Sequence, residues 1–81
     1  MDSLVLKFDS PETVSKVISQ IKDSGSELEL SPMSEGEVGK AQVFNQLLVI
    51  GSRKEIDEEL EQSLGQNWER YIIQGKDASE S

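Results

Sequence analysis

The chain of 81 residues contains neither cysteine nor histidine. Without histidine it lacks the usual general base near neutral pH and the commonest metal ligand. Without cysteine it has no thiol nucleophile, no disulfide and no thiolate metal site. Serine and lysine remain, but there is no Gly-x-Ser-x-Gly motif and no Ser-x-x-Lys pattern with its supporting motifs. We therefore expect a protein that is not an enzyme, with no catalytic residue, no metal and no cofactor.

Long apolar runs are also missing. No stretch approaches the ~18 consecutive apolar residues of a membrane-spanning helix. The first residues, Met1-Asp2-Ser3-Leu4, lack the basic region that precedes the apolar part of a signal peptide. These absences predict a cytoplasmic protein without a membrane span.

Basic residues are scarce, since eight Lys and Arg against sixteen Asp and Glu leave a formal net charge of −8. Proteins draw much of their affinity for nucleic acids from cations that displace counterions at the phosphates. Because the cations are scattered along this chain, we expect no direct binding to nucleic acid or to an anionic membrane. The acidic excess is compatible with two interpretations, simple solubility and affinity for a basic surface on another protein.

The sequence does contain clear hydrophobic periodicity in its first third. Residues 4–8 alternate in a way that predicts a strand. An apolar stripe at helical spacing then predicts a helix from 11 to about 23, with Ser10 as its cap, Pro11 in its first position and Gly25 beyond its end. The stripe is formed by Val14, Val17, Ile18 and Ile21.

The middle of the chain predicts two further strands. Residues 28–30 alternate, and Pro32 is expected to end that strand. Turn-forming residues fill the segment 31–41, which predicts a long connection. Residues 42–50 predict the longest strand, and the unbroken apolar run at 47–50 suggests burial on both of its faces.

The last third predicts a second helix and a fourth strand. Ser52 and Glu55 have the spacing of a capping box, in which each side chain bonds the backbone amide of the other residue. A helix is expected from about 53 to 64, stopped by Gly65, and a strand is expected over 68–73. The apolar stripe of the helix consists of Ile56, Leu60 and Leu64.

This order of strand, helix, strand, strand, helix and strand predicts an α+β fold. Two strand–helix–strand halves with right-handed crossovers give the ferredoxin-like arrangement, a four-stranded antiparallel sheet with both helices on one face. We expect one domain over 1–75 and a flexible tail over 76–81. The order is similar to that of small regulatory modules such as amino-acid-binding ACT domains, although Asp9-Ser10-Pro11 stands where those domains place a glycine.

The face of the sheet that the helices leave uncovered is the best functional clue. The strand at 42–50 offers two alternating sets of side chains, and the sequence leaves open which set meets the helices. Either way, several apolar side chains should remain outside, together with Val5, and monomers rarely leave such a patch bare. We therefore predict an interaction or regulatory module that dimerises or docks on a protein through this face. The predicted partner-binding residues are Val43, Asn45, Leu47, Val49, Trp68, Tyr71, Met33 and Val38.

Several alternatives remain beside this hypothesis. One is an acidic inhibitor, of the phage or mobile-element type, that occupies a nucleic-acid-binding protein. Another is a small-molecule sensor. The acidic residues at 55–61 are interpreted as a solvated helix face rather than a cation site. The glycines at 36 and 39 indicate a hairpin tip, since neighbouring acidic residues oppose phosphate binding. RNA recognition would rest on Phe8 and Phe44 alone and is disfavoured.

Overall fold

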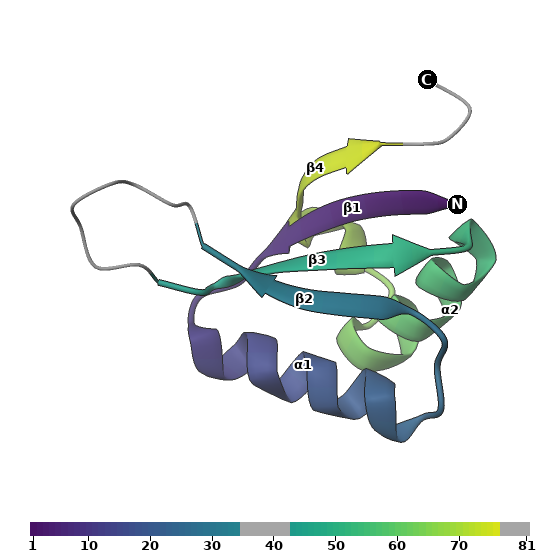
Figure 1. The fold of residues 1–81 in the computed structure, drawn as a ribbon, viewed down its shortest axis with the longest axis horizontal. Coiled ribbons are helices and arrows are strands. Elements are labelled where there is room, and N and C mark those ends of the chain that lie inside the picture. Colours follow the sequence, from purple (N-terminus) through teal and green to yellow (C-terminus); the bar gives the residue numbers. More distant parts are fainter. Residues whose placement is uncertain (35–42, 77–81) are drawn as a thin grey trace.

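The computed structural model describes residues 1–34 and 43–76. Its four strands form one antiparallel sheet in the order β2-β3-β1-β4 (Figure 1). This is the predicted ferredoxin-like order, with the first and third strands at the centre, so the fold class is confirmed. The elements are β1 (Asp2–Lys7), α1 (Pro11–Asp23), β2 (Glu29–Met33), β3 (Gln46–Gly51), α2 (Arg53–Leu64), the 3₁₀ helix η1 (Trp68–Tyr71) and β4 (Ile72–Lys76).

Helix α1 begins and ends where its local residues predict. Ser10 has extended backbone angles, and its Oγ accepts the Thr13 amide at 3.3 Å, which satisfies one amide of the first turn. Pro11 occupies the first helical position. Beyond the last turn, Gly25 adopts φ 81°, the left-handed conformation that glycine tolerates best.

Helix α2 also has the predicted bounds, but only half of the predicted capping box forms. The Ser52 Oγ accepts the Glu55 amide at 3.2 Å. The Glu55 carboxylate does not return to Ser52. It accepts hydrogen bonds from the connection between α1 and β2 instead. The second hydrogen bond of the capping box does not form because the Ser26 hydroxyl and the Glu27 amide donate to this carboxylate instead.

The strand boundaries differ from the predictions. Strand β2 runs through Pro32 to Met33, because an edge strand tolerates a proline whose missing N–H faces away from the ladder. Strand β3 begins at Gln46 rather than 42, and residues 43–45 lead into it as irregular backbone. Regular pairing therefore starts where Gln46 lies opposite both Lys7 and Met33.

The predicted strand at 68–73 is wrong in its first half. The Trp68 amide bonds the Gly65 carbonyl at 3.2 Å and the Arg70 amide bonds the Asn67 carbonyl at 3.1 Å, a spacing that makes a 3₁₀ turn. This turn buries the Trp68 side chain in the core. Strand β4 then begins at Ile72 and ends at Lys76, so the predicted start of the tail at residue 76 is one residue too early.

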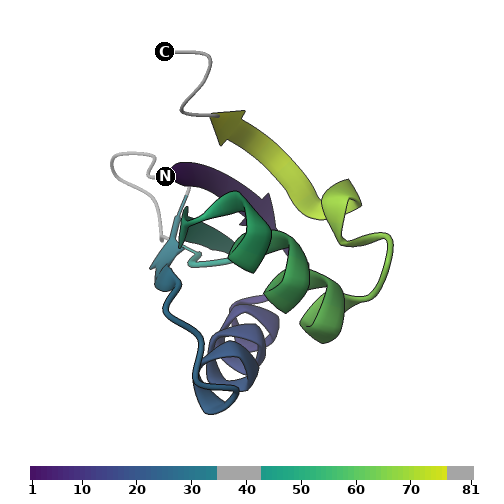
Figure 2. The ribbon, with the colours of Figure 1, turned by 90° about the vertical axis from the view of Figure 1, so that its right-hand side faces the viewer.

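One hydrophobic core lies between the sheet and the two helices, and Figure 2 shows both helices on the same side of the sheet. Within the residues that the structure describes, no helix is long and apolar enough to cross a membrane. The buried core consists of Leu4, Leu6, Phe8, Val14, Val17, Ile21, Leu28, Leu47, Val49, Ile56, Leu60 and Trp68.

Candidate functional site

The candidate site is the face of the sheet opposite the helices, which we call the open face. Side chains alternate between the two faces along a strand. Because Leu4 and Leu6 of β1 belong to the core, their neighbours in that strand point to the other side. The same argument holds for Leu30 of β2 and for Leu47 and Val49 of β3. The open face is therefore formed by Ser3, Val5, Lys7, Glu29, Ser31, Met33, Gln46, Leu48 and Ile50.

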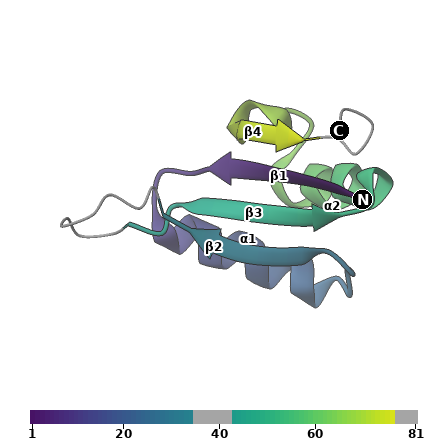
Figure 3. The same ribbon diagram turned by 45° about the horizontal axis from the view of Figure 1, so that its top comes forward.

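Strand register orders these side chains into three rows across β2, β3 and β1. In Figure 3 the three strands are seen from this side, with α1 and α2 behind them. Each of the three β3 residues on this face lies opposite one residue of β2 and one of β1. The rows are Glu29–Ile50–Ser3, Ser31–Leu48–Val5 and Met33–Gln46–Lys7.

The centre of the open face is apolar and its border is mainly polar. Leu48 and Ile50 are half-buried, and Val5 is only 8% exposed. Among the described elements, none lies over this face (Figure 3). The polar border consists of Ser3, Lys7, Glu29, Ser31 and the buried Gln46. An apolar centre with a polar rim is the usual anatomy of a protein interface.

The most exposed apolar side chains lie outside these three rows. Val43 and Phe44, which lead into β3, are 52% and 46% exposed. Ile73 of β4 is also exposed, and it has no partner in β1 because the register shifts there. These residues enlarge the apolar surface beyond the open face itself.

Two of the predicted partner-binding residues are incorrectly placed by the sequence argument. Leu47 and Val49 are fully buried beneath the helices. Both lie on the same side of β3 as Gly51, which is two residues beyond Val49 and four beyond Leu47. Gly51 lies directly under the side chain of Leu28, so this side of β3 faces the core. The alternate set, with Leu48 and Ile50, forms the open face. Both sets are equally apolar, so no signal in the sequence separates them.

The predicted aromatic contacts also change. Trp68 is 4% exposed and belongs to the core, so it is not available to a partner. Tyr71 packs partly against the core, with its ring 4.9 Å from that of Phe8. The Arg70 guanidinium lies over the Tyr71 ring and donates to its hydroxyl at 2.9 Å. Since Phe8 is buried, the pair of strand aromatics considered for RNA stacking does not form.

The remaining predicted residues have mixed roles. The Asn45 Nδ2 donates to the Phe8 backbone carbonyl at 3.2 Å, and the Asn45 backbone carbonyl accepts the Phe8 amide at 2.9 Å. These two hydrogen bonds join the end of β1 to the start of β3. Met33, the last residue of β2, is half-buried opposite Gln46, and Val43 is exposed in the segment that precedes β3. Val38 lies outside the described residues, as do the glycines at 36 and 39.

Two acidic side chains of α2 bind another segment of the chain, a role that the sequence does not predict. Glu55 Oε2 accepts the Ser26 Oγ at 2.9 Å and the Glu27 amide at 2.7 Å. Glu59 Oε1 accepts the Ser24 Oγ at 2.7 Å. These two carboxylates, one helical turn apart, hold the connection between α1 and β2 against α2. Nothing in the local pattern predicts this, because the donors are 28 to 35 residues away.

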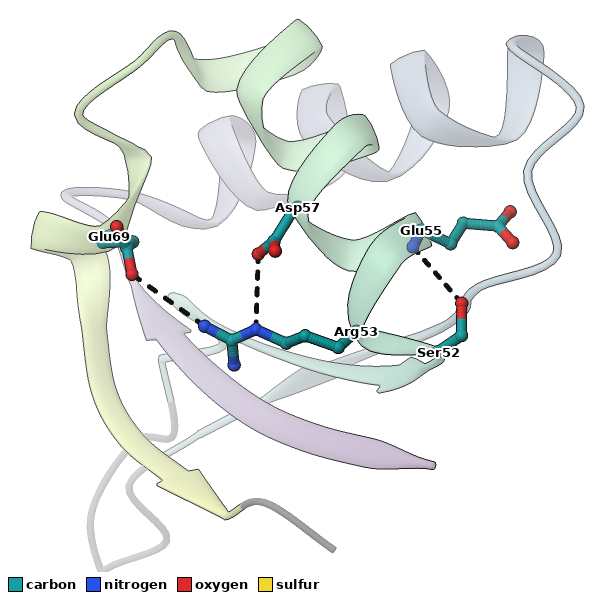
Figure 4. A network of polar contacts seen from close by, with 5 residues as sticks. All are labelled: Ser52, Arg53, Glu55, Asp57 and Glu69. Carbon is teal, nitrogen blue, oxygen red and sulfur yellow. Dashed lines mark hydrogen bonds and ion pairs between the residues drawn. The ribbon is translucent and has the colours of Figure 1, made fainter. Parts of the chain in front are cut away.

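Arg53 links the start of α2 to η1. Its Nε lies 3.3 Å from Asp57 and its terminal nitrogen lies 3.9 Å from Glu69 (Figure 4). All three side chains are substantially exposed, so these ion pairs contribute little to stability. In the part of the chain that the structure describes, no three acidic side chains are grouped closely enough to hold a metal ion.

Comparison with protein-family models, with curated proteins and with solved structures finds no match. The function proposed below therefore depends on the residues and their arrangement alone.

Proposed function

We propose that this chain is a non-enzymatic interaction module that docks on protein through the open face of its sheet. The observation that carries the proposal is the one-sided covering of the sheet. Both helices pack on the core face, while Val5, Leu48 and Ile50 form an apolar centre on the other. Covering apolar surface lowers the free energy by about 25 cal/mol per Å².

The edges of the sheet are poorer docking sites than its face. Strand β2 carries Glu29 and Pro32, and β4 has an irregular register at Ile73. Charges, prolines and bulges are the features that hinder the addition of a foreign strand at an edge. Docking on the face needs no free backbone groups, so these features do not oppose it.

The size of the open face indicates weak or regulated contacts. Four strands spaced by about 4.8 Å and about 5.5 residues long at ~3.3 Å each cover roughly 19 by 18 Å. That flat area of roughly 350 Å² is well below the ~800 Å² that each partner buries in a standard stable complex. A transient regulatory interaction fits this size better than a permanent subunit interface.

The acidic-inhibitor alternative receives less support from the side chains of α2. Phosphate mimicry needs several carboxylates that face a partner. Glu55 and Glu59 already accept internal hydrogen bonds, and Asp57 pairs with Arg53. Glu58 and Glu61 remain exposed on this helix, which is a short row for a phosphate mimic.

The test compares open-face variants with a matched variant on the helix layer. Ser31→Arg changes an exposed open-face residue, Leu48→Lys changes the apolar centre, and Ser19→Arg changes an exposed residue of α1. Tagged proteins are used to capture partners from native cell extract, and captured proteins are quantified by mass spectrometry. We expect one or more proteins retained by wild type and Ser19→Arg and reduced at least about tenfold by both open-face variants. Equal capture by all four proteins contradicts the proposal, provided that each variant melts cooperatively.

A further inference from the structure

We infer that the open face receives a single amphipathic helix of a partner protein, which lies along β3 with a basic edge over β2. This inference rests on the proposed function and names the kind of partner that the site binds. It follows from the width of the exposed apolar strip, from the edges of the sheet and from the charges on the two sides of the strip.

The exposed apolar surface of the open face follows β3, which lies between β2 and β1 (Figure 3). Leu48 and Ile50 succeed one another on this side of the strand and are half-buried. Phe44, which is 46% exposed, lies two residues before the first residue of β3. The strip over residues 44–50 is about 20 Å long, and the strands on either side of β3 are about 10 Å apart. Because an α-helix with its side chains is about 10–12 Å wide, this strip has the width of one helix.

A segment that covers this strip must satisfy its own backbone hydrogen bonds. Strands β3 and β1 each pair with a strand on both sides, so their backbone groups are used within the sheet. A partner strand would have to pair at an edge, where Pro32 in β2 and the register shift at Ile73 in β4 oppose it. A helix forms its backbone hydrogen bonds internally and presents only side chains, which suits a face that offers only side chains.

The area of the open face favours one helix over a second copy of this chain. The whole face covers roughly 350 Å², less than half of the ~800 Å² that each partner buries in a standard stable complex. A second copy would also bring a net charge of −8 against the −8 of the first. A helix of about 13 residues is about 20 Å long, so it matches the strip without a larger contact.

The charges beside the strip favour a helix with a basic edge toward β2. Glu29 is exposed on the β2 side, opposite Ile50, and its carboxylate has no ion-pair partner among the described residues. On the β1 side, Lys7 already has a partner within the chain. The sheet continues beyond β1 with β4, where Ile73 is 51% exposed and extends the apolar surface. A helix with apolar residues toward β1 and β4 and with Lys or Arg toward β2 matches this order, and the net charge of −8 attracts it.

Titration with two synthetic helices, followed by nuclear magnetic resonance, tests this inference. Each peptide has about 14 residues, a side-chain staple that keeps it helical, and leucines at helical spacing along one side. The polar residues are lysines in one peptide and glutamates in the other. At about 0.15 M salt, we expect the lysine peptide to shift the backbone amide signals of Ser31, Leu48 and Ile50. It should bind at least about tenfold more tightly than the glutamate peptide, because only the lysines meet an acidic border.

Matched variants separate docking on the open face from attraction by the net charge. Leu48→Lys and Ser31→Arg should each weaken binding of the lysine peptide at least about tenfold. Glu29→Gln should weaken it about two- to fivefold, as expected for the loss of one exposed ion pair. Glu58→Gln makes the same change in total charge at an exposed position of α2 and should leave binding nearly unchanged.

Three results of the titration overturn the inference: no binding of the lysine peptide at about 1 mM, shifts on α2 instead of the open face, or equal binding of both peptides. Open-face signals that shift with protein concentration in the absence of peptide identify a second copy as the occupant and also overturn it. If the peptides fail while capture of a cellular protein depends on Ser31 and Leu48, the inference fails and the proposed function stands. If neither peptide binding nor capture depends on the open face, both fail.

Discussion

Gly51 shows how one residue sets the orientation of β3. A Cβ built on Gly51 would overlap the Cδ2 of Leu28, which is itself part of the core. The close approach brings the start of β2 against the end of β3, where Glu29 lies opposite Ile50. Gly51 therefore belongs to the core face, together with Val49 and Leu47, and leaves Leu48 and Ile50 on the open face.

Gly51→Ala should lower the free energy of unfolding by about 1–3 kcal/mol, because the added methyl group overpacks the contact with Leu28. In a strand without this contact, alanine would be neutral or better than glycine. Urea denaturation followed by circular dichroism measures the change.

The double variant Leu28→Ala/Gly51→Ala supplies the control for this prediction. Removing the Leu28 side chain makes room for the new methyl group, so the cost of Gly51→Ala should fall by at least ~1 kcal/mol in the Leu28→Ala background. Equal costs in both backgrounds would show that the overlap with Leu28 is not the cause.

At the scale of elements, α2 holds the chain between α1 and β2 through two carboxylates. Glu55 receives two hydrogen bonds and Glu59 receives one, all from the segment Ser24–Glu27. This segment has Gly25 with positive φ and otherwise has few apolar residues to fix its path. Hydrogen bonds to charged acceptors are stronger than neutral ones, so the two glutamates specify where β2 begins.

Glu55→Gln should lower the free energy of unfolding by about 1–2 kcal/mol, because a neutral amide is a weaker acceptor for the Ser26 hydroxyl and the Glu27 amide. Hydrogen exchange of the Glu27 amide should become faster in this variant. Glu58→Gln, an exposed change on the same helix, is the matched control and should change stability by less than about 0.5 kcal/mol. Equal effects of the two variants would argue against the role of Glu55.

The elements also show which sequence signals are reliable. Both helices have the predicted bounds because their caps and apolar stripes act within a few residues along the chain. The alternation of Trp68, Arg70 and Ile72 predicts a strand from residue 68, but the turn at Gly65–Asn67 starts a 3₁₀ helix there instead. Alternation over so few residues does not separate a strand from a short turn that buries one large side chain.

At the scale of the whole molecule, the dominant electrostatic feature is the net charge of −8. Like charges distributed over a small domain repel one another and oppose its compact state. The exposed ion pairs of Arg53 offset little of this repulsion. Dissolved salt screens the repulsion, and the screening length falls from roughly 20 Å at 20 mM to about 4 Å at 500 mM.

Raising NaCl from about 20 to 500 mM should therefore raise the melting temperature by about 3–6 °C, which corresponds to roughly 1 kcal/mol in a domain of this size. Calorimetry at a low protein concentration of about 5 µM measures the change and keeps intermolecular contacts negligible. In the variant Glu58→Lys/Glu61→Lys the net charge becomes −4, since each change adds two positive units, and the salt effect should fall by at least half. A melting temperature that decreases with salt would show that attractive pairs outweigh the repulsion.

The sequence by itself determined the class of the fold, the bounds of both helices and the absence of histidine and cysteine chemistry, because caps, helical periodicity and composition are local properties. Only the tertiary structure decided which side of β3 faces the helices, where Trp68 lies and what the Glu55 carboxylate binds. Those features depend on contacts between segments far apart in the chain, such as Leu28 with Gly51 and Glu27 with Glu55. The open face is set by the same distant contacts, since a shift of one residue in β3 would exchange its two sides.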